Sequence, residues 1–302
     1  MAECYVGFGN ELADCAGSVI LRYWRRPFGI DEKVESGRAM ASSPVTEADR
    51  GAEREMRELI ASRFPSHGIR GEEFGESLNF ASAEWQWVLD PIDGTKSFMT
   101  GKPVFGTLIA LCRHGTPVLG IIDQCVQEER WIGYLDADGK TYTTTLNGVP
   151  VKNRPASCET LREAFAYATT PDMFAKGEET EKFLDMKNRV KRMLYGCDCY
   201  AYALLASGFG PSIVIEADLQ PYDFLALVPV VKGAGCLITD WQGNDLTLKS
   251  KTGRVIACAN RPLFKEAIAL LSAKKTPTIS PIALAFAAGA ACAFILARAT
   301  TK

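Results

Sequence analysis

The chain has 302 residues, of which 47% are hydrophobic, and a formal net charge of −2 at pH 7. This length allows one large domain or two interlocked halves, and the balanced charge argues against a nucleic-acid partner. Ten cysteines without a Cys-x-x-Cys pair, and no secretory signal peptide, indicate a reduced, intracellular protein. Because there are only two histidines, a zinc site is disfavoured and any metal should be bound by oxygen.

The N-terminal part of the sequence predicts two helices. Apolar residues recur at helical spacing from Leu12 to Tyr23. A second helix is expected to start after Thr46, whose side chain would cap it, and Asp49 stands at the acid position of a capping box. The polar stretch 33–43 between the two helices is expected to be a mobile loop.

The stretch at 87–95, WVLDPIDGT, places two aspartates where a strand meets a helix. Pro91 cannot donate a hydrogen bond to a sheet, so we expect the strand to end there, directly after Asp90. Asp93 would cap the following helix, whose free N–H groups favour a phosphate, while paired carboxylates favour a hard cation. The stretch predicts metal-assisted phosphate chemistry, although an ordinary capped turn would explain it equally well when it is taken alone.

The remaining patterns predict a mixed α/β fold with layered helices and sheets. Gly71-Glu72-Glu73 suits a loop that brings a carboxylate to a site, and it also suits an exposed acidic turn. Strands are expected at 104–112, 118–124, 130–135, 141–146, 164–168, 192–195, 212–216, 236–240 and 254–259. Helices are expected at 173–189, 199–207, 222–232 with a kink at Pro229, and 263–271.

Residues 282–297 form a nearly uninterrupted apolar stretch. As a helix it would span roughly 24 Å, which is short of the ~30 Å hydrocarbon core of a bilayer. A C-terminal membrane anchor and a helix packed on the domain or a partner are equally consistent with this pattern. We expect one domain at 1–272, with halves at about 1–155 and 156–272, followed by a linker and the apolar segment at 273–302.

Three motifs together resemble the magnesium-dependent inositol monophosphatase superfamily. They occur in the family's order over about residues 5–272, as Gly71-Glu72-Glu73, Asp90-Pro91-Ile92-Asp93-Gly94-Thr95, and Pro221-Tyr222-Asp223 followed by Gly233-Ala234-Gly235. The resemblance implies the family's alternating α-β-α-β-α sandwich and a homodimer. Two stretches look most like the plant-type histidinol-phosphate phosphatase branch: WVLDPIDGTKSFMTGKP at 87–103 and LYGCDCYAYALLAS at 194–207.

The resemblance also implies a metal site for Mg²⁺, with Mn²⁺ as a substitute. The first ion would be held by Glu72, Asp90 and the backbone carbonyl of Ile92. The second would be held by Asp90, Asp93 and Asp223, so that Asp90 bridges the two ions. Carboxylates and carbonyls are the ligands that these hard cations prefer.

Further roles carried over from the family concern the phosphate and the attacking water. Gly94 and Thr95 would offer backbone N–H groups to the phosphate. Glu72 and Thr95 would position and activate the water. Asp49 would orient a further water or a third metal ion, while its alternative role is simply to cap a helix.

Asp198 and Glu216 are the candidate contacts to the rest of the substrate. Asp198 could instead cap a helix, and Glu216 could be the partner of an ion pair. The sequence as a whole predicts a phosphomonoesterase that acts on a small phosphorylated metabolite, L-histidinol phosphate. The alternatives are inositol monophosphate or another sugar phosphate as substrate, and a non-catalytic, membrane-tethered scaffold. The expected location is the cytoplasm, with tail anchoring and a plastid left open.

Overall fold

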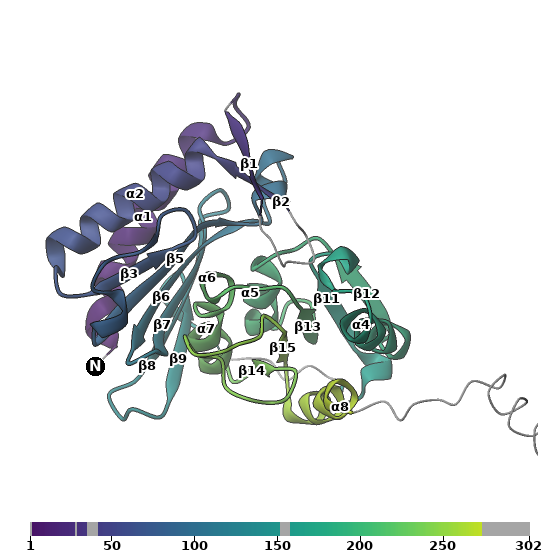
Figure 1. Cartoon of the computed structure of the whole chain (residues 1–302). Coiled ribbons are helices and arrows are strands. Elements are labelled where there is room, and N and C mark those ends of the chain that lie inside the picture. The colour runs from purple at the N-terminus through teal and green to yellow at the C-terminus, as the bar shows by residue number, and fades with distance from the viewer. Residues whose placement is uncertain (1, 28, 35–41, 152–157, 274–302) are drawn as a thin grey trace, which may run out of the picture. The chain divides into compact units, whose positions relative to one another are not determined.

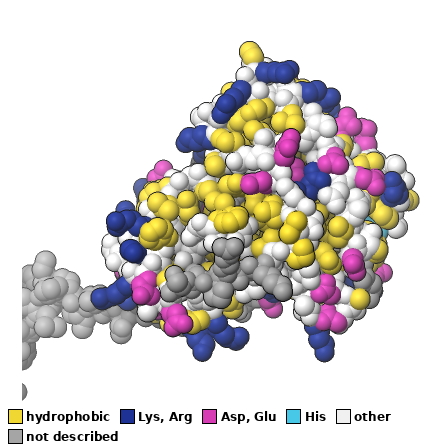
Figure 2. Space-filling view, turned by 180° about the vertical axis from the view of Figure 1, so that it is seen from behind, with side chains coloured by type: hydrophobic (Ala, Val, Ile, Leu, Met, Phe, Trp, Pro, Cys, Tyr) yellow, Lys and Arg dark blue, Asp and Glu magenta, His cyan; other side chains and the backbone are white. Residues whose placement is uncertain are grey.

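The computed structural model describes residues 2–27, 29–34, 42–151 and 158–273. These residues contain two large β-sheets with helices packed on their faces, and a separate two-stranded sheet (Figure 1). The expected mixed α/β class is confirmed. Acidic and basic side chains are interspersed with apolar ones over the face drawn in Figure 2. Within the described part of the chain, no helix is both long and apolar enough to cross a bilayer. The apolar stretch at 282–297 lies outside the described residues.

The N-terminal segment forms a helical layer on one face of the larger sheet (Figure 1). Its elements are η1 (Glu3–Tyr5), α1 (Val6–Tyr23), β1 (Ile30–Val34), β2 (Ser42–Thr46) and α2 (Glu47–Arg63). Thr46 caps α2 and forms a capping box with Asp49, as predicted. The prediction of a loop at 33–43 is wrong at both ends of this stretch, because β1 and β2 pair there as an antiparallel hairpin. Residues 35–41 lie outside the described chain.

The larger sheet has the strand order β10-β9-β8-β7-β6-β5-β3-β4. Its pairs are antiparallel except that β3 runs parallel to β5. Side chains alternate between its two faces, so Leu89 packs toward α1 and α2 while Val88 packs toward the second half of the chain. The strands are β3 (Gly68–Gly71), β4 (Gly75–Glu76), β5 (Trp85–Asp93), β6 (Gly106–Arg113), β7 (Thr116–Gln124), β8 (Glu129–Leu135), β9 (Tyr142–Leu146) and β10 (Val149–Pro150), with η2 (Phe80–Ser82) before β5.

Strand β5 does not stop at Pro91, which corrects the sequence prediction. It continues to Asp93, and its register against β6 shifts between Asp90 and Asp93. The missing N–H of Pro91 is accommodated in this irregular segment, where its carbonyl accepts a hydrogen bond from Thr107 Oγ1 at 2.8 Å. The short helix α3 (Thr95–Met99) follows, and its N-cap is Gly94 rather than the predicted Asp93.

The second half builds a five-stranded sheet of order β12-β11-β13-β15-β14. Helices α5, α6 and α7 pack in a shared core with apolar side chains of both sheets, and α4 and α8 cover the other face of the smaller sheet. The layers therefore alternate as α-β-α-β-α, as expected. The elements are η3 (Leu161–Glu163), β11 (Phe165–Ala168), η4 (Pro171–Met173), α4 (Glu178–Arg189), β12 (Arg192–Tyr195), α5 (Tyr200–Ser207), β13 (Ile213–Glu216), α6 (Pro221–Phe224), α7 (Leu227–Gly233), β14 (Leu237–Asp240), β15 (Val255–Cys258) and α8 (Arg261–Ser272).

Two helix predictions in this half need correction. The helix expected at 173–189 begins only at Glu178, because Gly177 has a φ of 95°. The kinked helix expected at 222–232 is two helices, α6 and α7, and Pro229 lies in the first turn of α7. An N–H has no intrahelical partner in that turn, so proline is tolerated there.

Helix α7 lies so close to β8 that only glycine fits at position 133. A Cβ on Gly133 would stand 2.2 Å from the carbonyl carbon of Pro229. We expect Gly133→Ala to lower the free energy of unfolding by about 2–3 kcal/mol, since overpacking forces the backbone apart. Urea unfolding measures this. Gly210→Ala is the matched control, because a Cβ there meets nothing within 4 Å. An equal effect of both changes would contradict the packing argument.

Candidate active site

Three aspartates from two distant parts of the sequence meet at the irregular end of β5. Asp90 and Asp93 come from β5, and Asp223 comes from α6, which contacts β5. One carboxylate oxygen of each residue lies within 4.8 Å of the others. The burial of Phe224 in the core between the sheets anchors α6 there. The structure thus brings together the three acids that the sequence proposed for the second metal.

The electrostatics of this cluster favour a bound cation. Burial raises the pKa of Asp90 well above its ordinary value, and repulsion from Glu72, Asp93 and Asp223 adds to this. Burial also raises the pKa of Asp93, opposed by the Cys199 backbone N–H, which donates to Asp93 Oδ2 at 2.6 Å. Carboxylates held this close are stabilised by a divalent cation, and an all-oxygen donor set suits Mg²⁺ or Mn²⁺. The residues present therefore fit the implied metal.

A cavity of about 480 Å³ opens beside this cluster. All but one of the site residues expected from the sequence line it: Glu72, Asp90, Ile92, Asp93, Gly94, Thr95, Asp198, Glu216 and Asp223. The exception is Asp49. The role of each residue remains a prediction, but all nine residues line the same cavity.

The turn between β5 and α3 is fixed by its own hydrogen bonds. The Ile92 N–H donates to Asp90 Oδ1 at 3.0 Å, and the Thr95 hydroxyl donates to the Ile92 carbonyl at 3.1 Å. Gly94 has a φ of 86°, in the left-handed region that favours glycine. The first residues of a helix have no intrahelical acceptor for their N–H groups, so the predicted anion-binding role of Gly94 and Thr95 is compatible with this turn.

Asp49 is part of the helix cap rather than of the cavity wall. Its Oδ2 accepts hydrogen bonds from the Thr46 backbone N–H at 2.8 Å and from the Thr46 hydroxyl at 2.5 Å. Burial raises the pKa of Asp49 to about 6. The capping interpretation accounts for these contacts, and the role in orienting water stays a prediction.

Asp198 lies against the turn at Gly94 from the other half of the chain. Its Oδ2 accepts a hydrogen bond from Ser97 Oγ at 2.8 Å. Burial raises the pKa of Asp198, while Ser97, Lys96 and Lys102 oppose the shift. The N-cap of α5 is Cys199, so the interpretation of Asp198 as the cap of that helix is wrong.

Glu216 ends β13 and is held by neutral donors. Its Oε1 accepts hydrogen bonds from the Thr169 hydroxyl at 2.5 Å and the Thr169 N–H at 3.2 Å, and its Oε2 accepts one from the Tyr202 hydroxyl at 2.9 Å. Among the described residues Glu216 forms no ion pair, so the ion-pair interpretation is not supported.

Sequence reasoning missed several residues of the cavity wall, notably Thr169, Asp172, Tyr202 and Asp218. Thr169 follows β11, and Glu216 ends the neighbouring parallel strand β13, so the carboxyl ends of the two strands meet at one edge. The strands themselves were predicted. The sequence did not show that β11 and β13 pair with each other, because no local pattern reveals strand pairing.

Glu216 should give the protein a pH-dependent stability. Burial raises the pKa of Glu216 from 4.5 to about 7. In this range the folded state holds a proton that the unfolded state has released, so the free energy of unfolding falls as pH rises. For the chelated protein we expect Glu216 to contribute a fall of up to about 3 kcal/mol across this range, and Glu216→Gln to remove it. Urea unfolding at about pH 5 and about pH 8 measures the slope. An unchanged slope in Glu216→Gln would contradict the assignment.

Comparison with known proteins agrees with this geometry. Residues 1–276 match the model of the inositol monophosphatase family. The bifunctional phosphatase IMPL2, chloroplastic, of Arabidopsis thaliana is 50% identical over 257 residues, which are 85% of this chain and 70% of the relative. A histidinol-phosphatase of Chlorobaculum parvum is 31% identical and covers 86% of this chain and 94% of its own length.

A solved structure supports the same relationship. An inositol monophosphatase from Zymomonas mobilis is 38% identical, superposes with a TM-score of 0.75, and covers 90% of this chain and 98% of its own. The matched region includes both halves of the fold and the three aspartates beside β5. The chain therefore belongs to the inositol monophosphatase family, whose members are metal-dependent, and it is a phosphomonoesterase.

Proposed function

We propose that this chain hydrolyses L-histidinol phosphate to histidinol and phosphate with the aid of Mg²⁺. The observation that carries the proposal is the acidity of the cavity beyond the aspartate cluster. Four carboxylates there outnumber two lysines, Lys96 and Lys102: Asp172, Asp198, Glu216 and Asp218. The histidinol-phosphatase of Chlorobaculum parvum, at 31% identity, supports the same substrate.

Charge complementarity favours this substrate over a neutral polyol. Histidinol phosphate carries an ammonium group and an imidazole, both of which can donate charge-assisted hydrogen bonds to carboxylates. Asp198 and Glu216 lie on the wall of the same cavity as the phosphate-facing turn at Gly94. A substrate whose phosphate lies at this turn would present its cationic groups to these acids.

The residues that would hold the metal are Glu72, Asp90, Asp93, Asp223 and the carbonyl of Ile92. When bound, divalent cations neutralise phosphoryl charge and lower the pKa of water. This chemistry needs no histidine, which agrees with a cavity rich in carboxylates.

The remaining steps belong to the chain's own groups. The backbone N–H groups of Gly94 and Thr95 would bind the phosphate oxygens and orient the ester. The carboxylate of Glu72 would accept a proton from the attacking water, which the Thr95 hydroxyl helps to position. Because Asp90 is buried beneath the cavity, bulk water does not screen the charges that act there.

The second candidate substrate is inositol monophosphate. It is favoured by the 38% identity to the inositol monophosphatase from Zymomonas mobilis. The aspartates and the phosphate-facing turn would serve either substrate, and only the acids of the outer wall discriminate between them. A non-catalytic scaffold is the weakest alternative, because the chain carries the complete set of proposed metal ligands.

Phosphate release from the purified full chain tests the proposal. L-Histidinol phosphate and inositol 1-phosphate are compared with Mg²⁺ and with EDTA. We expect Mg²⁺-dependent release that favours histidinol phosphate. Asp198→Asn and Glu216→Gln should each lower kcat/KM for histidinol phosphate about tenfold while changing inositol 1-phosphate little, as expected for a lost charge-assisted hydrogen bond. Asp240→Asn, a buried acid outside the cavity, is the control. An unchanged substrate ratio would contradict the role of the two acids.

Location and assembly are separate proposals. The family resemblance implies a homodimer. The sequence favours a cytoplasmic location, whereas the Arabidopsis relative is described as chloroplastic and supports a plastid location. Fractionation of cells that express the full chain, or a chain ending at Lys275, tests the proposed anchor at 282–297. If residues 282–297 anchor the protein, the full chain should be found in the membrane pellet and the truncated chain in the soluble fraction.

A further inference from the structure

A second cavity, of about 850 Å³, lies between α1 and strands β7 to β9. Side chains alternate along β7, so Asp123 shares the α1 face of the sheet with Ile121. Asp90 alternates with Leu89 on β5 and therefore points to the opposite face. The second cavity is separate from the proposed active site, and nothing in the proposed reaction uses it.

Asp123 lines this cavity and has a buried carboxylate oxygen without a hydrogen-bond partner in the described part of the chain. The side chain of Asp123 is 4% exposed, and its Oδ2 accepts no hydrogen bond from any of the described residues. It lies 3.8 Å from the place that a Cβ on Gly17 would occupy. Gly17 also lines the cavity, so no side chain of α1 packs on Oδ2 at this position. A buried acceptor left without a donor is costly, so the site favours a molecule that supplies one.

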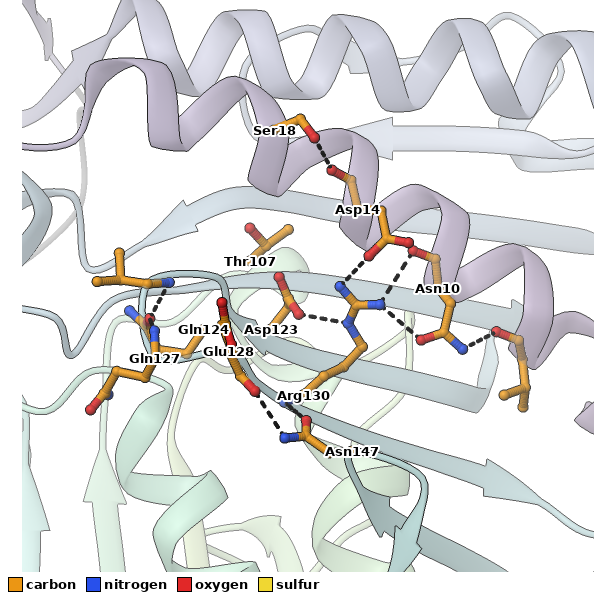
Figure 3. A network of polar contacts seen from close by, with 12 residues as sticks. Asn10, Asp14, Ser18, Thr107, Asp123, Gln124, Gln127, Glu128, Arg130 and Asn147 are labelled. Carbon is orange, nitrogen blue, oxygen red and sulfur yellow. Dashed lines mark hydrogen bonds and ion pairs between the residues drawn. The ribbon is translucent and has the colours of Figure 1, made fainter.

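The neighbouring arginine donates its hydrogen bonds to other acceptors and makes none to Oδ2 (Figure 3). Arg130 Nε donates to the other oxygen of Asp123 at 2.6 Å. One terminal nitrogen donates to Asn10 Oδ1 at 2.8 Å, and the other donates to Asp14 Oδ1 at 2.7 Å. The network holds the guanidinium in place, and none of its hydrogen bonds reaches Asp123 Oδ2.

The charged and apolar residues that line the cavity indicate the chemical class of a ligand that could supply the donor. Four carboxylates line it, against the single guanidinium of Arg130: Glu3, Asp14, Asp123 and Glu128. The resulting negative potential attracts cations and repels phosphates. Ala13, Leu21 and Ile132 add apolar wall. Because Arg130 already bridges Asp14 and Asp123, these acids do not converge on one point as metal ligands do, which favours an organic cation.

We propose that this cavity binds a small organic cation, with an ammonium or guanidinium group on a short hydrocarbon body. The cationic group donates a hydrogen bond to Asp123 Oδ2, and the hydrocarbon contacts the apolar wall. The volume is within the range of small-molecule sites in proteins. This inference does not depend on the substrate of the active site.

The test is calorimetric titration of the full chain, in Mg²⁺ buffer at low ionic strength, with putrescine and with 1,4-butanediol. The two probes share a hydrocarbon body and differ in charge. We expect putrescine to bind and the diol not to bind. Asp123→Asn should weaken putrescine binding about tenfold or more, the size expected when one charge-assisted hydrogen bond is lost. If Asp123→Asn does not fold, the exposed pair Asp14→Asn and Glu128→Gln provides the same test.

Two control variants locate the binding. Glu11→Gln changes another exposed acid on α1 that pairs with an arginine, Arg63, but does not line the cavity. Glu216→Gln changes the active-site cavity instead. Both should leave putrescine affinity unchanged. The proposal is overturned if putrescine does not bind, if the diol binds equally well, or if Glu216→Gln weakens binding while the changes at Asp123, Asp14 and Glu128 do not.

Discussion

Asp90→Asn is expected to lower kcat/KM for every phosphate ester by about 10³-fold or more. Asp90 lies at the centre of the acidic cluster, and its pKa is raised by burial and by Glu72, Asp93 and Asp223 together. Under the proposed function its carboxylate bridges the metal sites, and such ions supply several kcal/mol of charge stabilisation, at ~1.4 kcal/mol per tenfold in rate. Steady-state phosphate release measures the loss.

The same change should not destabilise the chelated protein. Asparagine removes one of several buried negative charges that repel one another, so the free energy of unfolding in EDTA should stay constant or rise. Asp240→Asn is the matched control, because Asp240 is buried and accepts hydrogen bonds from the Gln242 and Asn244 N–H groups. We expect that control to lower stability and to leave kcat unchanged. A loss of activity accompanied by unfolding of Asp90→Asn would remove the support for a metal role.

The composition of the candidate site was accessible from the sequence because its chemistry is concentrated in short motifs. Asp90, Asp93 and Thr95 lie within six residues of one another, and the irregular end of β5 turns this spacing directly into a site wall. Asp223 was placed by family resemblance rather than by spacing. Its approach to β5 depends on the packing of α6 in the core between the two sheets, which no local pattern contains.

The fold predictions failed where tertiary structure overrides local preference. Pro91 predicts the end of a strand, yet β5 continues past it because the register shifts there. The polar stretch at 33–43 was expected to be a loop, yet its ends pair as β1 and β2. The cavity at Asp123 was also invisible in the sequence, since it forms only where α1 crosses strands far along the chain.

Gly94→Ala is expected to lower kcat/KM about 100-fold, the size that a displacement of about 1 Å in the catalytic geometry can produce. A Cβ at this position would stand 2.7 Å from Asp198 Oδ2, and Asp198 is held in place by Ser97. Either the carboxylate or the turn must move, and the turn carries the N–H groups proposed to bind phosphate. The left-handed backbone adds about 1–2 kcal/mol of destabilisation.

Gly139→Ala separates these two effects. Gly139 also has a positive φ, of 68°, but a Cβ there meets nothing within 4 Å. We expect it to carry the backbone cost alone, with kcat/KM unchanged. Comparing two substrates then distinguishes a displaced turn, expected in Gly94→Ala, from the loss of the Asp198 carboxylate in Asp198→Asn. Gly94→Ala should weaken turnover of histidinol phosphate and inositol 1-phosphate equally, since both present a phosphate to the turn, whereas Asp198→Asn should affect the cationic substrate more. If Gly94→Ala were selective for one ester, the turn would be recognising the alcohol rather than the phosphate.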